Sequence, residues 1–188
     1  MINPMDLTGK RILVTGATGG IGRETAVQLS KLGATVVISG RNPDKLQQTY
    51  EMLEGEGHAK YTIDLDDVDS LEEVMKSIVS ECGAFHGYAH CAGVSQMRPF
   101  KMTKKENIID MMNSSYFSFV EIVRCLSKKG CFEDGGSIVA ISSTASIQGK
   151  QSKVAYSAAK AALDASVRCM ICDLKKKKSG LTLLCPAG

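Results

Sequence analysis

The stretch that decides the fold is Arg11-Ile12-Leu13-Val14-Thr15-Gly16-Ala17-Thr18-Gly19-Gly20-Ile21-Gly22. Its first five residues are nearly all apolar, which is typical of a strand buried on both faces of a parallel sheet. A glycine-rich loop comes next, and residues 23–32 then have the spacing of an amphipathic helix that stops at Gly33. A lone glycine loop is more often a plain turn, but strand, loop and helix in this order predict a dinucleotide site. The glycines let the backbone approach a pyrophosphate, and the N–H groups of the helix N-terminus face its charge.

The same alternation continues along the chain. Further strands are expected at residues 35–39, 58–63, 87–90, 137–141 and 181–184. Helices are expected from Pro43, over 70–80 with Ser70 as the cap, over 103–128 and over 155–175. Strands joined by crossover helices predict an α/β fold, a three-layer, doubly wound parallel sheet. At 188 residues, 44% of them hydrophobic, we expect a single domain over residues 1–188.

A second informative stretch is Tyr156-Ser157-Ala158-Ala159-Lys160. Residues four apart lie on one face of a helix, so the Lys160 ammonium is expected close to the Tyr156 phenol. A nearby cation stabilises a phenolate, which makes Tyr156 a usable proton donor or acceptor near neutral pH. Alone, the pair is also typical of a solvated helix, and its meaning depends on the glycine loop at the other end of the chain.

Together these motifs resemble the short-chain dehydrogenase/reductase family, which is marked by Thr-Gly-x-x-x-Gly-x-Gly and a later Tyr-x-x-x-Lys. Here the two motifs span Thr15–Gly22 and Tyr156–Lys160. Between them, in the family's order, stand Asp64-Leu65, Ala92-Gly93, Asn113 and Ser143. The resemblance covers nearly the whole chain and is closest to the 3-oxoacyl-thioester (acyl-carrier-protein) reductases. It implies a Rossmann fold and an oxidoreductase that interconverts a ketone and a secondary alcohol.

The resemblance also implies roles for individual residues. In the reducing direction, a nicotinamide gives hydride to a carbonyl carbon while Tyr156 protonates the oxygen. Ser143 would hold the carbonyl by a hydrogen bond, and its spacing to Tyr156 favours it over the neighbouring Ser142. Lys160 would stabilise the Tyr156 phenolate and bond the nicotinamide ribose, and Asn113 would position a water that passes protons to Lys160.

The cofactor preference can be predicted from the end of the second strand, which reads Gly40-Arg41. An acidic residue there would favour a ribose 2′-hydroxyl, whereas the planar fork of arginine suits a 2′-phosphate. NADP(H) is therefore favoured over NAD(H), the alternative being a surface arginine without a ligand. By resemblance, Asp64 bonds the adenine edge and Leu65 packs near it. The expected cofactor-binding residues are Gly16, Thr18, Gly19, Gly20, Ile21, Gly22, Arg41, Asp64, Leu65, Cys91, Ala92, Gly93, Tyr156, Lys160 and Pro186.

The chain departs from the family pattern in three places. The usual Asn-Ala-Gly after the fourth strand reads Cys91-Ala92-Gly93, and the Pro-Gly after the sixth reads Pro186-Ala187-Gly188. Family members also continue beyond this point with a substrate-covering segment and a last strand. We therefore expect a domain that lacks the last strand and the substrate lid, either as a fragment or with an omitted tail. A catalytically silent NADP-binding or oligomerisation module is the alternative function.

Composition and charge narrow the classes of partner. A net charge of +3 is too small to indicate nucleic acid, and the run Lys175–Lys178 is interpreted as a solvated helix end. No apolar run reaches membrane-spanning length and residues 1–6 do not resemble a signal peptide, so a soluble, cytoplasmic protein is expected.

No metal site or disulfide framework is expected. The seven cysteines are odd in number and scattered through apolar segments, and Cys169-x-x-Cys172 has no second pair and no nearby histidine. Reduced, packed thiols are the preferred interpretation. The three histidines, His58, His86 and His90, have no metal-ligand spacing and are assigned no chemistry.

Two helices suggest an assembly. The helices predicted over 103–128 and 155–175 are apolar on more than one side, which indicates a second burial partner. By resemblance, that partner is the same helix pair of another subunit, related by a two-fold axis in a homodimer or homotetramer. The residues on which this depends are Met111, Phe117, Val120, Leu163, Val167 and Met170.

Overall fold

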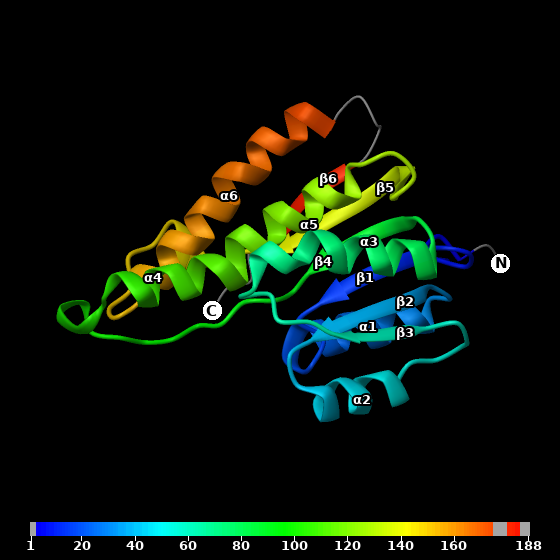
Figure 1. The fold of residues 1–188 in the computed structure, drawn as a ribbon, viewed down its shortest axis with the longest axis horizontal. Coiled ribbons are helices and arrows are strands. Elements are labelled where there is room, and N and C mark those ends of the chain that lie inside the picture. Colours follow the sequence, from blue (N-terminus) through cyan, green and yellow to red (C-terminus); the bar gives the residue numbers. More distant parts are fainter. Residues whose placement is uncertain (1–2, 175–179, 185–188) are drawn as a thin grey trace.

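A computed structural model describes residues 3–174 and 180–184. Its six strands form one sheet in the order β3-β2-β1-β4-β5-β6, and every neighbouring pair is parallel (Figure 1). This is the strand order of doubly wound dinucleotide-binding folds, so the predicted fold class is confirmed. The strands are β1 Arg11–Thr15, β2 Thr35–Gly40, β3 Ala59–Thr62, β4 Phe85–His90, β5 Phe132–Ile141 and β6 Gly180–Leu184.

Helices cover both faces of the sheet (Figure 1). Alternate residues of β1 enter different cores: Leu13 joins the larger one, while Ile12 and Val14 join the smaller one. α1 and α2 close the smaller core, and α3, α5 and α6 close the larger one. The helices are α1 Gly20–Lys31, α2 Pro43–Glu51, α3 Leu71–Cys82, α4 Lys105–Met112, α5 Ser118–Leu126 and α6 Val154–Leu174.

The helix predicted over 103–128 is interrupted. A π-helical segment, η3 Asn113–Phe117, separates α4 from α5, so the prediction of one regular helix was wrong at this point. Insertions of this kind are often found at functional sites. Short 3₁₀ turns complete the described chain as η1 Val68–Ser70, η2 Phe100–Met102 and η4 Thr144–Ser146.

Ser70 stands before α3 as predicted but does not cap it through its side chain. Its hydroxyl instead donates 3.0 Å to the carbonyl of Asp67. The fifth strand was also predicted too short, because β5 begins at Phe132 and not at Ser137.

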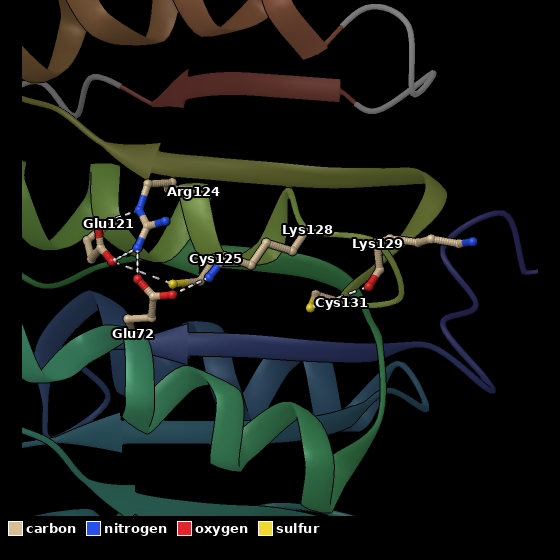
Figure 2. Close-up of polar contacts among 7 residues, drawn as sticks. All are labelled: Glu72, Glu121, Arg124, Cys125, Lys128, Lys129 and Cys131. Atoms are coloured by element: carbon tan, nitrogen blue, oxygen red, sulfur yellow. Dashed lines mark hydrogen bonds and ion pairs between the residues drawn. The ribbon is translucent and has the colours of Figure 1, made fainter.

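Charged side chains join α3 to α5 on one surface of the molecule, as Figure 2 shows. Glu72 of α3 pairs with Arg124 of α5 and with Lys128, which follows the end of α5, and Arg124 also binds Glu121 through its Nε at 2.9 Å. Arg124, Lys128 and Glu72 are each nearly half exposed, so each pair contributes little stability alone. The network holds α5 in register against α3, and α5 begins where η3 ends.

The apolar residues on which the expected assembly depended are not all available at the surface. Met111, Leu163 and Val167 are buried within the chain itself. Phe117 is 41% exposed, whereas Val120 and Met170 pack at the edge of the larger core. Simple burial against the sheet therefore accounts for half of that set.

Several other expectations can be compared with the structure. Cys169 and Cys172 are exposed on α6, so the expectation of packed thiols was wrong for this pair, because both lie on the helix face turned away from the core. Lys175–Lys178, Cys185 and Pro186 lie outside the described residues. In residues 3–174 and 180–184, no helix is long and apolar enough to cross a membrane, and no cluster of potential metal ligands is present.

Candidate active site

The glycine loop after β1 approaches its neighbours so closely that side chains would not fit. A Cβ on Gly16 would lie 2.7 Å from the backbone N and Cα of Ala92, and the φ of Gly16 is +73°. A Cβ on Gly22 would lie 2.2 Å from the Gly16 carbonyl oxygen. Glycine at these positions lets the loop fold against the end of β4 and the start of α1, as pyrophosphate binding requires.

The same loop is held by side chains of α1 and α2 that the sequence did not single out. Arg23 donates from Nε to Thr49 Oγ1 at 2.9 Å and from Nη2 to the Thr18 carbonyl at 3.0 Å. Thr49 in turn donates to the Ala17 carbonyl at 2.7 Å. These bonds hold the Ala17 and Thr18 carbonyls in place where the loop leads into α1, whose N-terminus suits an anion.

A cleft of about 550 Å³ runs along this end of the sheet. Its size and the glycine residues that line it fit a dinucleotide. Asp66 lines it where Asp64 was expected, and Tyr156 and Lys160 do not contribute to its walls. The expected residues that do line it are Gly16, Thr18, Gly19, Gly20, Ile21, Gly22, Arg41, Leu65, Cys91, Ala92 and Gly93, and those not foreseen are Gly40, Asn42, Lys45, Ile63, Asp66, Val94 and Ser114.

Two cations and one carboxylate stand at one end of the cleft. Arg41 and Lys45 both line it, from the end of β2 and the first turn of α2. Arg41 Nη1 lies 2.9 Å from Asp66 Oδ2. Burial raises the pKa of Asp66 and the Arg41 charge opposes this shift. Both side chains are partly exposed, so solvent screens the pair and a competing anion can replace the carboxylate.

Lys160 lies in a buried position beside the cleft. Only 3% of the residue is exposed, and its Nζ donates to the Ile141 carbonyl at the end of β5 at 2.7 Å. Burial lowers the pKa of Lys160 to about 8, against the opposing influence of Asp164. A Cβ on Gly93, which lines the cleft, would lie 3.2 Å from Lys160 Nζ, so the ammonium is adjacent to the cleft wall.

The predicted pairing of Tyr156 with Lys160 is present. Lys160 Nζ lies 6.0 Å from the centre of the Tyr156 ring, and Lys153 Nζ lies 5.4 Å from it. Both ammonium groups are therefore within cation–π range of the Tyr156 ring.

The two candidate serines have different partners. The Ser142 hydroxyl donates to the Asp164 carboxylate. Ser143 Oγ accepts from the Ala145 N–H at 3.2 Å at the start of η4, a bond that leaves the Ser143 hydroxyl proton free to donate. Of the two serines, Ser143 is therefore the one whose hydroxyl proton is uncommitted, and it is also the one that the spacing favours.

The structure adds contacts of Asn113 and His90 that the sequence did not predict. The Asn113 amide donates to the Asp66 carbonyl, on the loop after β3, at 3.2 Å, and its role in positioning a water stays a prediction. His90, which was assigned no chemistry, is fully buried at the end of β4, and burial, reinforced by the Lys160 charge, lowers its pKa to about 3. Its Nδ1 lies 3.0 Å from Thr15 Oγ1 and 2.7 Å from the Tyr88 hydroxyl. A neutral imidazole thus braces the first residue of the glycine motif, in a region where the family's asparagine is missing.

The geometry agrees with comparisons to known proteins. The family model described as short chain dehydrogenase matches residues 10–188, and the chain belongs to this family. Its members are oxidoreductases that act on carbonyl or alcohol substrates with nicotinamide cofactors.

Curated relatives carry out varied reactions. The chain is 33% identical over 174 residues to an L-xylulose reductase of Caenorhabditis elegans, covering 90% of this chain and 67% of that protein. It is 30% identical over 157 residues to a 3-oxoacyl-[acyl-carrier-protein] reductase of Vibrio harveyi, covering 84% and 64%. A hydroxynaphthalene reductase of Aspergillus fumigatus is 27% identical, covering 98% and 68%. The chain thus spans about two thirds of the length of these relatives.

A solved structure supports the fold along the whole chain. The oxidoreductase yciK of E. coli superposes with a TM-score of 0.84 at 26% identity, covering 100% of this chain and 79% of that one.

Proposed function

We propose that this chain carries the cofactor site and catalytic group of an NADP(H)-dependent oxidoreductase that interconverts a ketone and a secondary alcohol. The main observation behind this proposal is the position of the buried Lys160 ammonium. It lies close to the Tyr156 ring and next to the cleft that the glycine loop lines. Burying a lysine that retains its charge is costly, and such positions are typical of functional sites.

Each catalytic side chain has a role that its surroundings support. When bound in the cleft, a nicotinamide supplies the hydride. The Ser143 hydroxyl donates to the carbonyl oxygen of the substrate and Tyr156 delivers the proton to that oxygen. Lys160 stabilises the phenolate that remains, since an adjacent cation favours the charged form of a phenol. The carbonyl of Ile141 fixes the Lys160 ammonium at the end of β5.

The preference for NADP(H) depends on the charges at the end of β2. Arg41 and Lys45 both line the cleft there, and a 2′-phosphate would offer them a doubly charged acceptor. Asp66 pairs with Arg41 at 2.9 Å, so the phosphate must compete with one partly exposed carboxylate. Two cations against one such carboxylate favour the phosphate.

The substrate class proposed first is a 3-oxoacyl thioester or a similar small carbonyl compound. The support is the order of the motifs and the 30% identity to the acyl-carrier-protein reductase. Assembly as a homodimer or homotetramer is proposed with it, because the exposed Phe117 and the edge residues Val120 and Met170 lie on η3, α5 and α6.

The alternative function is a catalytically silent NADP-binding module. One substitution distinguishes this alternative from the enzyme. Tyr156→Phe keeps the ring and its contacts with both lysines but removes the transferable proton. We expect NADPH affinity, measured by fluorescence titration, to stay near that of the wild type. Reduction of an activated ketone or 3-oxoacyl thioester by the full-length protein should fall ~10²–10⁴-fold.

Ser142→Ala and Ser143→Ala form the matched control pair for this experiment. Only Ser143→Ala should slow the chemical step, because the Ser142 hydroxyl is bound to Asp164. A full-length protein that keeps its rate after Tyr156→Phe would refute the mechanism. Tight NADPH binding without any turnover would favour the silent module.

A further inference from the structure

Ser115 is a buried hydroxyl for which the proposed mechanism has no use. It lies in η3 with an exposed fraction of 0%, and within residues 3–174 and 180–184 its Oγ has no hydrogen-bond partner. Its neighbours behave differently: Ser114 donates back to the Asp110 carbonyl at 3.1 Å and Ser118 to the Ser114 carbonyl at 3.0 Å. A buried hydroxyl without a partner is costly and calls for an explanation in the site around it.

The unpartnered Ser115 hydroxyl is next to the buried ammonium. Ser115 Oγ and Lys160 Nζ each lie 3.2 Å from the point where a Cβ on Gly93 would be. The two atoms are therefore separated by no more than twice that distance, which a change of the Ser115 side-chain rotamer together with one bridging water can span. Glycine at position 93 keeps the space between them free of a side chain.

Lys160 has unused hydrogen-bond capacity. An ammonium carries three donors, and the one hydrogen bond that the described residues supply to it comes from the Ile141 carbonyl. The family resemblance assigns a second donor to the nicotinamide ribose. A third donor of the Lys160 ammonium remains. Ser115 Oγ lies close enough to accept from it, directly or through one water, and has no other hydrogen-bond partner among the described residues.

We propose that Ser115 is a positioning residue, whose hydroxyl accepts a hydrogen bond from the Lys160 ammonium, directly or through one water, and holds it charged beside Tyr156. This deepens the proposed function and rests on the role that it gives Lys160. The π-helical turn provides the arrangement, because it turns Ser115 inward while the Asn113 amide donates to the Asp66 carbonyl.

The charge on Lys160 is subject to other groups that face it. Asp164 and Tyr156 come from α6, and His90 and Cys91 come from the end of β4. His90 is neutral, and Asp164 favours the charged lysine. Removing the Ser115 hydroxyl leaves all four groups in place, so a change in Lys160 titration can be assigned to Ser115.

The test measures the titration of Lys160 in the chain without any assay of turnover. Lysine labelled with ¹³C and ¹⁵N would be followed by NMR against pH, and Lys160→Met would identify the signal. In Ser115→Ala we expect the pKa of Lys160 to fall by about one unit, since a hydrogen bond to the charged form favours it. Ser114→Ala and Ser118→Ala, whose hydroxyls have backbone partners, should leave it unchanged, as should Asn113→Ala.

An unchanged Lys160 pKa in Ser115→Ala would overturn the proposal, and a fall in Asn113→Ala instead would assign the contact to Asn113. Neither result depends on whether the protein is an oxidoreductase. In an active full-length protein, Ser115→Ala should also move the lysine-dependent limb of the kcat pH profile. Loss of turnover in Tyr156→Phe with no such movement in Ser115→Ala would support the proposed function and reject the role of Ser115.

Discussion

Replacing Lys160 with methionine should expose how much stability the protein gives up to keep an ammonium in its interior. Burial lowers the pKa of Lys160 from 10.5 to about 8. Between these two pH values the unfolded chain binds more protons than the folded one, so the stability of the wild type rises with pH through this window. Lys160→Met keeps an apolar side chain of similar length but removes the charge. The stability of this variant should therefore not rise with pH in this window.

The size of the effect follows from the shift. From pH 7 to pH 10 the wild type should gain roughly 2–3 kcal/mol relative to Lys160→Met, since one pKa unit corresponds to about 1.4 kcal/mol. Loss of the bond to the Ile141 carbonyl also changes stability, but by an amount that does not depend on pH and cancels in the comparison.

Urea denaturation at several pH values between 7 and 10 measures the free energies of unfolding. Lys76→Met, on the exposed side of α3, is the matched control, because its ammonium is already in solvent. A difference between wild type and Lys160→Met that stays constant from pH 7 to pH 10 would refute the burial argument. The same shift in the control would point to a global effect of charge.

Three other substitutions, one of them with a matched control, test the remaining features. Arg41→Asp should weaken NADPH binding by roughly tenfold or more and narrow or reverse the preference over NADH; a wild type that binds NADH equally well in a titration would contradict this. Gly22→Ala places a Cβ 2.2 Å from the Gly16 carbonyl, so it should lower the stability of the fold by about 1–3 kcal/mol and abolish cofactor binding. In Gly19→Ala the added Cβ meets nothing within 4 Å, and this variant should keep the stability of the wild type in thermal melts. Phe117→Glu should shift the protein towards monomer in light scattering at micromolar concentration, and a monomeric wild type would reject the proposed assembly.

The parts of the fold that could be predicted from the sequence are those written in local patterns. An apolar run followed by glycines identified β1 and its loop, and the Tyr156–Lys160 spacing needed only helix geometry. What was missed depends on contacts between distant segments. Arg23 reads as a surface residue of an amphipathic helix, and only the packing of α2 brings Thr49 within its reach.

His90 shows the same limit. Nothing near it in the sequence predicts that a histidine seventy-five residues from Thr15 will contact the Thr15 hydroxyl. Ser115 could not be distinguished from its neighbours for a related reason, because periodicity assigns faces only while the helix remains regular. The water-positioning role of Asn113 depended on family resemblance and stays a prediction, whereas its hydrogen bond to the Asp66 carbonyl could not be predicted from the sequence.

The π-helical turn carries an implication for how this chain can change over evolution. Met111 and Phe119 are both buried although eight residues separate them, a spacing that would place them about 80° apart on a regular helix at 100° per residue. One additional residue absorbed in the turn brings them within about 20°. Deletion of one residue here would therefore force either α4 or α5 to rotate about its axis. Only an insertion nearby that restored the number of residues in the turn would avoid this rotation. We expect substitutions to accumulate in residues 113–117 more readily than changes in their number, with the length of this turn retained as a fixed spacer.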